Sequence, residues 1–131
     1  MASIHREIRL RVPAAQVWDA LRDVGALHER LARGFVTAVQ MEEGARVVTF
    51  ANGLVARELI VDIDDQRRRL AWSVVGGRMT HHNASAQVVT QGDDRCRFVW
   101  ITDVLPDTIA PYISSQMDLG VEAMKAALEP A

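Results

Sequence analysis

Residues 53–77 read GLVARELIVDIDDQRRRLAWSVVGG, with two strand-like segments on either side of one turn. Residues 54–63 and 70–75 are rich in β-branched and apolar side chains, which favour strands, whereas the acidic residues, Gln66 and arginines between them are typical of a turn. Glu58 is a carboxylate inside an otherwise apolar strand, where a charge is costly unless it is solvated, paired or facing a cavity. The stretch therefore predicts a β-hairpin and raises the question of where Glu58 points.

Turn residues recur about every ten positions from residue 35 onward, which is typical of an antiparallel meander. Alternation of apolar and polar residues over 4–12 predicts a further, half-buried strand at the start of the chain. Arg6 breaks that alternation, so we expect it near the strand end or paired with a neighbour. The meander strands are predicted at 35–43, 45–52, 54–63, 68–75, 80–91 and 95–105.

Helical spacing appears before and after the meander. Apolar residues after Pro13 recur at helical spacing as far as Gly25, and residues 26–32 form a second short helical segment. Beyond Pro106 and Pro111, an apolar stripe predicts a long last helix of about 18 residues. The element order is a strand, two helices, six strands and a long helix, which describes a single α+β domain over residues 1–131.

Composition and charge narrow the class of protein. A chain of 131 residues suits one domain, and 49% hydrophobic with 24% charged residues is typical of a globular protein. The formal net charge of -2 removes the electrostatic reason to expect nucleic-acid binding. The single cysteine, Cys96, cannot form an internal disulfide, which favours a reducing compartment and hence the cytoplasm. No run approaches the roughly 20 apolar residues of a membrane span, so we expect no stable membrane insertion.

This element order resembles the helix-grip fold of START domains, polyketide cyclase-like proteins and Bet v 1-like plant pathogenesis-related proteins. Two sequence motifs, Ala-Arg-Glu-Leu at 56–59 and Trp-Ser-Val-Val-Gly-Gly at 72–77, also resemble segments of plant abscisic acid receptors. Val-Trp-Asp-Ala-Leu at 17–21 is typical of the superfamily. The resemblance implies a seven-stranded curved antiparallel sheet wrapped around a long C-terminal helix, with two short helices after the first strand.

Two departures separate the chain from the hormone receptors. The receptors carry a Ser-Gly-Leu-Pro gate, whereas residues 52–55 read Asn-Gly-Leu-Val, and Met79 stands where the receptors have a loop histidine. Hormone sensing is therefore not expected. What the resemblance still implies is an apolar cavity between the sheet and the last helix, which in this superfamily holds lipids, sterols, polyketides or hormones.

The resemblance points Glu58 into this cavity, where it could hydrogen-bond a ligand hydroxyl or act as an acid or base. Simple alternation argues the opposite, because it places the more apolar phase of the strand inside: Leu59, Val61 and Ile63. A β-bulge would reconcile the two orientations. Arg46 in the adjacent strand would be the counter-ion of Glu58 if both face inward.

The other candidate ligand-binding residues belong to the inward phases of the strands and to one ridge of the last helix. An ordinary packed core would use the same positions, although two small alanines in one strand leave room for a ligand. His81 and His82 are adjacent and point to opposite faces, so we expect no metal site, and no cofactor is implied. Besides Glu58, the candidates are Val48, Phe50, Trp72, Val74, His82, Ala84, Ala86, Phe98, Trp100, Tyr112, Gln116 and Gly120.

These observations favour binding of a small hydrophobic molecule, by a monomer or a homodimer, in a cavity between the sheet and the C-terminal helix. The alternative is a polyketide cyclase or dehydratase, in which Glu58, His82 or Tyr112 would transfer protons. A regulatory or protein-interaction module is a second alternative. The sequence contains no serine nucleophile elbow, phosphate-binding loop or zinc-ligand spacing.

Overall fold

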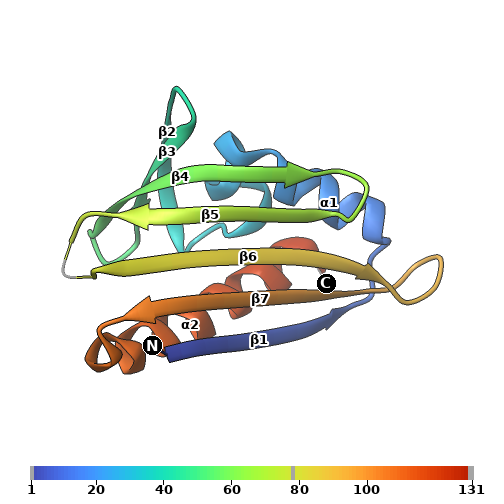
Figure 1. Cartoon of the computed structure of the whole chain (residues 1–131). Helices are drawn as coiled ribbons and strands as arrows, with labels where there is room; N and C mark the ends of the chain where they lie inside the picture. The colour runs from blue at the N-terminus through green and yellow to red at the C-terminus, as the bar shows by residue number, and fades with distance from the viewer. Residues whose placement is uncertain (1, 78, 130–131) are drawn as a thin grey trace.

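The computed structural model describes residues 2–77 and 79–129. One antiparallel sheet contains seven strands in the order β1-β7-β6-β5-β4-β3-β2, so the strand at the amino terminus pairs with the last strand of the meander (Figure 1). The strands are β1 (Ala2–Leu10), β2 (Val36–Glu42), β3 (Ala45–Phe50), β4 (Val55–Asp64), β5 (Arg69–Val75), β6 (His81–Thr90) and β7 (Cys96–Leu105).

Helices connect β1 to β2 and follow β7. The first group is α1 (Ala14–Arg22) with the short turns η1 (Val24–Ala26) and η2 (Leu27–Leu31), and the last is η3 (Asp107–Ile109) with α2 (Ala110–Leu128). Figure 1 shows α2 running along one face of the sheet, behind β6, β7 and β1. The α+β class and the helix-grip arrangement predicted from the sequence are confirmed. In the described residues, no helix combines the length and the apolar character needed to cross a membrane.

The predicted strands agree with the observed ones to within about two residues, and local chemistry explains the shifts. β1 ends at Leu10 because the next backbone N–H, that of Arg11, donates to the carboxylate of Glu129 at the end of α2. β3 ends at Phe50 because Asn52 and Gly53 form the turn, in which Gly53 has a φ of +89° that favours glycine. The segment predicted as a helix over 26–32 consists of a 3₁₀ turn followed by a π-helical turn.

The turn between β4 and β5, at the centre of the opening stretch, is held by its own charged residues. Asp64 accepts a hydrogen bond from the backbone N–H of Arg67 at 2.9 Å. Asp65 accepts from Trp18 Nε1 at 2.9 Å and from Arg22 Nε at 2.8 Å, and the hydrogen bond from Arg22 lowers the pKa of this carboxyl. The turn therefore fastens the helix α1 to the meander.

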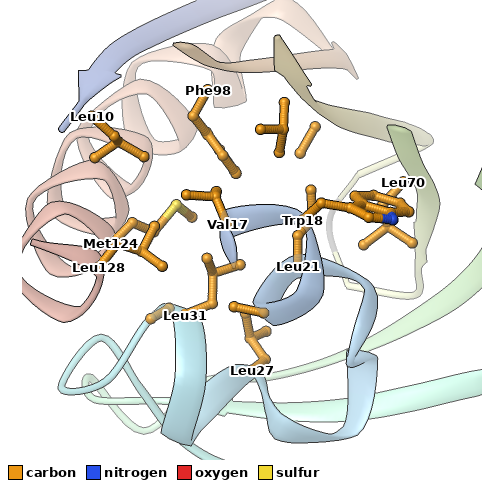
Figure 2. Packing of buried hydrophobic residues seen from close by; sticks show 14 of the residues in the cluster. Leu10, Val17, Trp18, Leu21, Leu27, Leu31, Leu70, Phe98, Met124 and Leu128 are labelled. Carbon is orange, nitrogen blue, oxygen red and sulfur yellow. The ribbon is translucent and has the colours of Figure 1, made fainter. Parts of the chain in front are cut away.

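The main core lies between the inner face of the sheet and the helices. Figure 2 shows apolar side chains of α1 and η2 meeting those of the strands and of the end of α2, including Val17, Phe98 and Met124. A smaller cluster joins Ile4 and Val104 to the first half of α2. Arg6, predicted to lie at the strand end or to pair, lies in the middle of β1 and bonds Asp118 of α2 at 2.7 Å. This ion pair joins the long helix to the sheet.

Candidate functional site

A cavity of about 300 Å³ lies between the inner face of the sheet and α2. Strands β2 to β7, the η2 segment and α2 as far as Met124 supply most of its walls, and α1 contributes Leu21. Most of its lining side chains are apolar, and its volume is at the lower end of the range for small-molecule pockets, roughly 300–1,000 Å³. The space suits a compact molecule rather than a two-chain lipid.

Glu58 points to the inner face and lines this cavity. It lies opposite Arg46 on β3, and the register between β4 and β5 shifts between Ile60 and Asp62. Because Glu58 faces inward, Leu59 and Val61 alternate outward, and Val61 is 63% exposed. The inward phase predicted for these two residues is therefore wrong. The shift is a β-bulge that takes up one residue, after which Ile63 lies opposite the buried Leu70.

Arg46 and Glu58 form a buried ion pair in the cavity wall, with exposed fractions of only 3% and 6%. The Nε of Arg46 donates to Oε1 of Glu58 at 2.8 Å, and Nη1 donates to the carbonyl oxygen of Val24 at 3.2 Å. The guanidinium also lies over the ring of Trp72, 5.6 Å from its centroid. Burial raises the pKa of the Glu58 carboxyl, while the charge and hydrogen bond of Arg46 act in the opposite direction.

Two hydrogen-bonding positions of this pair have no partner in the described part of the chain. Among the described residues, no hydrogen bond reaches Nη2 of Arg46 or Oε2 of Glu58. A third free donor stands on the same cavity wall, because the indole N–H of Trp100 is buried without a partner in the described chain. A buried polar group without a partner is costly, so these positions are suited to polar atoms of a ligand.

His82 lines the cavity on β6, two strands away from Glu58. The register puts it in line with Val74 and Glu58, so roughly 10 Å separates the backbones of the two titratable residues. Its Nδ1 lies 3.0 Å from the sulfur of Met79. Burial, and then the charge of His81, lowers the pKa of His82 to about 4, so the imidazole is neutral at neutral pH.

The β3–β4 turn and the start of α2 form one end of the cavity. Asn52 donates from Nδ2 to the hydroxyl of Tyr112 at 3.1 Å, and its Oδ1 accepts from the backbone N–H of Leu54 at 3.0 Å. Leu54 and Val55 line the cavity although they are more than half exposed. Because these apolar residues face both the solvent and the cavity, this end is where a ligand could enter.

Two of the predicted ligand-binding residues do not line the cavity. Val48 is fully buried in the main core. Gly120 lets α2 approach the sheet, because a Cβ there would lie 3.0 Å from the ring of Trp100 and 3.3 Å from that of Phe35. The structure places the other predicted residues in the lining: Phe50, Glu58, Trp72, Val74, His82, Ala84, Ala86, Phe98, Trp100, Tyr112 and Gln116.

The lining also contains residues that the sequence did not single out for the site. Thr102 shares the inward phase of Phe98 and Trp100, so its polar side chain could have been recognised from that pattern. Leu27 and Leu31 are spaced like any packed helix face, and no sequence signal distinguishes a cavity wall from a core there. No group of metal-binding side chains occurs among the described residues.

Comparisons with known proteins agree with this architecture. The structure of XoxI from Bacillus cereus shares 16% identity over 99% of this chain and 97% of that chain, with a TM-score of 0.88. Truncated norcoclaurine synthase from Thalictrum flavum shares 18% over 99% and 94%, with a TM-score of 0.77. A START superfamily protein from Mycobacterium smegmatis shares 11% over 97% and 94%, with a TM-score of 0.73. At these identities the likeness shows the fold alone.

The search of curated proteins returned no match. The family comparison is more informative, because one family model covers residues 1–129, nearly the whole chain. Its description is polyketide cyclase / dehydrase and lipid transport. The chain therefore belongs to the polyketide cyclase/dehydrase and lipid transport family.

Proposed function

We propose that the protein binds a small, mostly apolar molecule in the cavity between the sheet and α2. The observation that carries this proposal is the cavity itself, about 300 Å³ of space beside a buried ion pair. Voids larger than a water molecule are few in protein interiors, so a space of this size supports a binding role rather than imperfect packing. The lipid-transport part of the family description agrees with this reading.

Apolar burial would supply most of the binding free energy, at roughly 25 cal/mol for each Å² removed from water. The aromatic rings of Phe50, Trp72 and Phe98 in the lining offer broad contact surfaces. The few polar groups would fix the orientation of the molecule, since unpaired donors and acceptors inside the cavity gain partners only from a ligand.

Proton transfer on the bound molecule, as in a cyclase or dehydratase, is the second candidate. The observation in its favour is that Glu58 and His82 line the same cavity. Glu58 is engaged by Arg46, however, and the depressed pKa of His82 makes it a weak base. With no hydrogen bond between these two residues, the arrangement favours binding over catalysis.

Cavity filling tests the binding proposal. Ala84 lines the cavity on β6, and Ala84→Leu or Ala84→Phe would occupy its space. The neutral dye Nile red should bind the natural protein with one-to-one stoichiometry, and both substitutions should weaken its binding at least about tenfold, about 1.4 kcal/mol. Native mass spectrometry of freshly purified protein should also detect a bound apolar compound.

The matched control is Ala71→Leu, which adds the same bulk to β5 at a position outside the cavity. It should leave dye binding unchanged. The proposal fails if Ala84→Leu retains its fold by circular dichroism and still binds Nile red as tightly as the natural protein.

A further inference from the structure

We propose that the cavity selects uncharged ligands that carry a hydroxyl group and rejects carboxylates, and that Glu58 determines this choice. The inference rests on the proposed binding function and makes it more specific. It concerns the charge and the hydrogen-bonding pattern of the ligand rather than the existence of a ligand.

The first argument is the charge of the lining. Among the described lining residues, the groups that ionise are Arg46, Glu58, His82 and Tyr112. Arg46 and Glu58 neutralise each other at 2.8 Å, and burial keeps His82 uncharged at neutral pH. The described part of the wall therefore carries no net charge, so a buried carboxylate would find no unpaired cation among these residues.

The second argument is that the Nε side of Arg46 is already engaged. Its Nε binds the carboxylate of Glu58, its Nη1 binds the carbonyl oxygen of Val24, and its face covers Trp72. A ligand carboxylate could not form a side-on bidentate pair, through Nε and Nη2, without displacing Glu58. Any approach through Nη2 would also bring the two negative groups close together in a water-poor site, where their repulsion is strong.

The third argument is the pattern of free positions. Oε2 of Glu58 can only accept a hydrogen bond, and Nη2 of Arg46 can only donate one. A hydroxyl group meets both requirements, because it donates its proton to the carboxylate and accepts from the guanidinium. A carboxylate lacks the proton, and an ester or ether oxygen satisfies the donor alone.

Ligands of matched length separate these possibilities. Decanol, decanoate and methyl decanoate should be compared by isothermal titration calorimetry at about pH 7.5, where decanoic acid is ionised. The natural protein should bind decanol at least about tenfold more tightly than decanoate, with the ester between them. Equal or tighter binding of decanoate would overturn the inference.

Changing Glu58→Gln should reverse the preference, because the charge of Arg46 is then uncompensated and attracts the carboxylate. We expect about a tenfold advantage for decanoate over decanol. Changing Arg46→Gln as well removes the charge and should abolish the reversal. If Glu58→Gln folds and still prefers decanol to the same extent, Glu58 is not the determinant.

The matched control is Glu42→Gln, which removes a carboxylate from an exposed Arg-Glu pair, that with Arg57 at 3.2 Å. It should leave the order of affinities unchanged. The measurement on the natural protein decides the charge preference even if Glu58→Gln does not fold. If Nile red, decanol, decanoate and methyl decanoate all fail to bind, the proposed function is overturned. Tight binding of decanoate overturns only this inference.

Discussion

The inner face of the sheet has two ends that differ in how their apolar side chains are covered. At one end, Leu10 and Leu70 pack with side chains of α1 and the end of α2, and both are almost completely buried (Figure 2). At the other end, Val74 and His82 border the cavity and remain partly exposed. The strands alternate in the same way at both ends, so the difference lies in what fills the space beside them.

The comparison shows where the fold tolerates a charge. The buried charged residues in the described chain are Arg46 and Glu58, and both line the cavity. At the cavity end, the charges of Arg46 and Glu58 are buried as a pair. A buried pair contributes little net stability but is costly to break, because one charge is left without a partner. The cavity end therefore depends on an intact ion pair, and the packed end depends on contacts between apolar side chains.

The largest effect is expected from breaking the pair with Arg46→Met. We expect this change to lower the free energy of unfolding by about 4 kcal/mol, because Glu58 is left buried and unpaired. Urea denaturation measures the loss. The loss should shrink at lower pH, since protonation of Glu58 removes its charge. A loss below about 1 kcal/mol at neutral pH would contradict the claim that the Arg46–Glu58 pair is costly to break.

A matched pair of truncations compares the packed core with the cavity lining. Val48→Ala removes methyl groups from a fully buried position and should cost about 2–3 kcal/mol, because it leaves a new void. Val74→Ala removes the same groups from the cavity lining and should cost about 1 kcal/mol, because space already exists there. Equal losses in urea denaturation would mean that the cavity is packed as tightly as the core.

The third effect is the pH dependence of stability contributed by His82. Its pKa is lowered to about 4 in the folded state from 6.5, so the unfolded chain binds more protons between these values. The contribution to stability should be complete above pH 6.5 and should be lost as the pH falls toward 4. The full shift corresponds to about 3.4 kcal/mol, and solvent screening of the partly exposed imidazole reduces the expected loss to about 2 kcal/mol.

Thermal denaturation across this pH range measures the dependence of stability on His82. His82→Gln should flatten the curve, whereas His81→Gln removes only the smaller of the two causes of the lowered pKa and should change the curve less. An unchanged curve for His82→Gln would show that His82 is not desolvated.

Local patterns in the sequence predicted most of the fold. The turn residues around Asp64 and Asn52 and the apolar stripe of α2 each act over a few neighbouring residues, and the structure confirms them. The site was predicted less completely. Eleven of the thirteen candidates line the cavity, but Val48 and Gly120 do not, because alternation and helical spacing report which face a residue occupies and not what stands opposite.

The sequence by itself determined the class of fold, the order of the elements and the face of most strand residues, because each depends on short-range periodicity and turn chemistry. Tertiary structure decided the direction of Glu58, its pairing with Arg46 and the position of the cavity. The direction of the Glu58 side chain depends on a bulge two to three residues farther along β4. The position of the cavity depends on where α1 and α2 no longer cover the inner face of the sheet. Both arise from contacts between segments far apart in the chain, which no local pattern encodes.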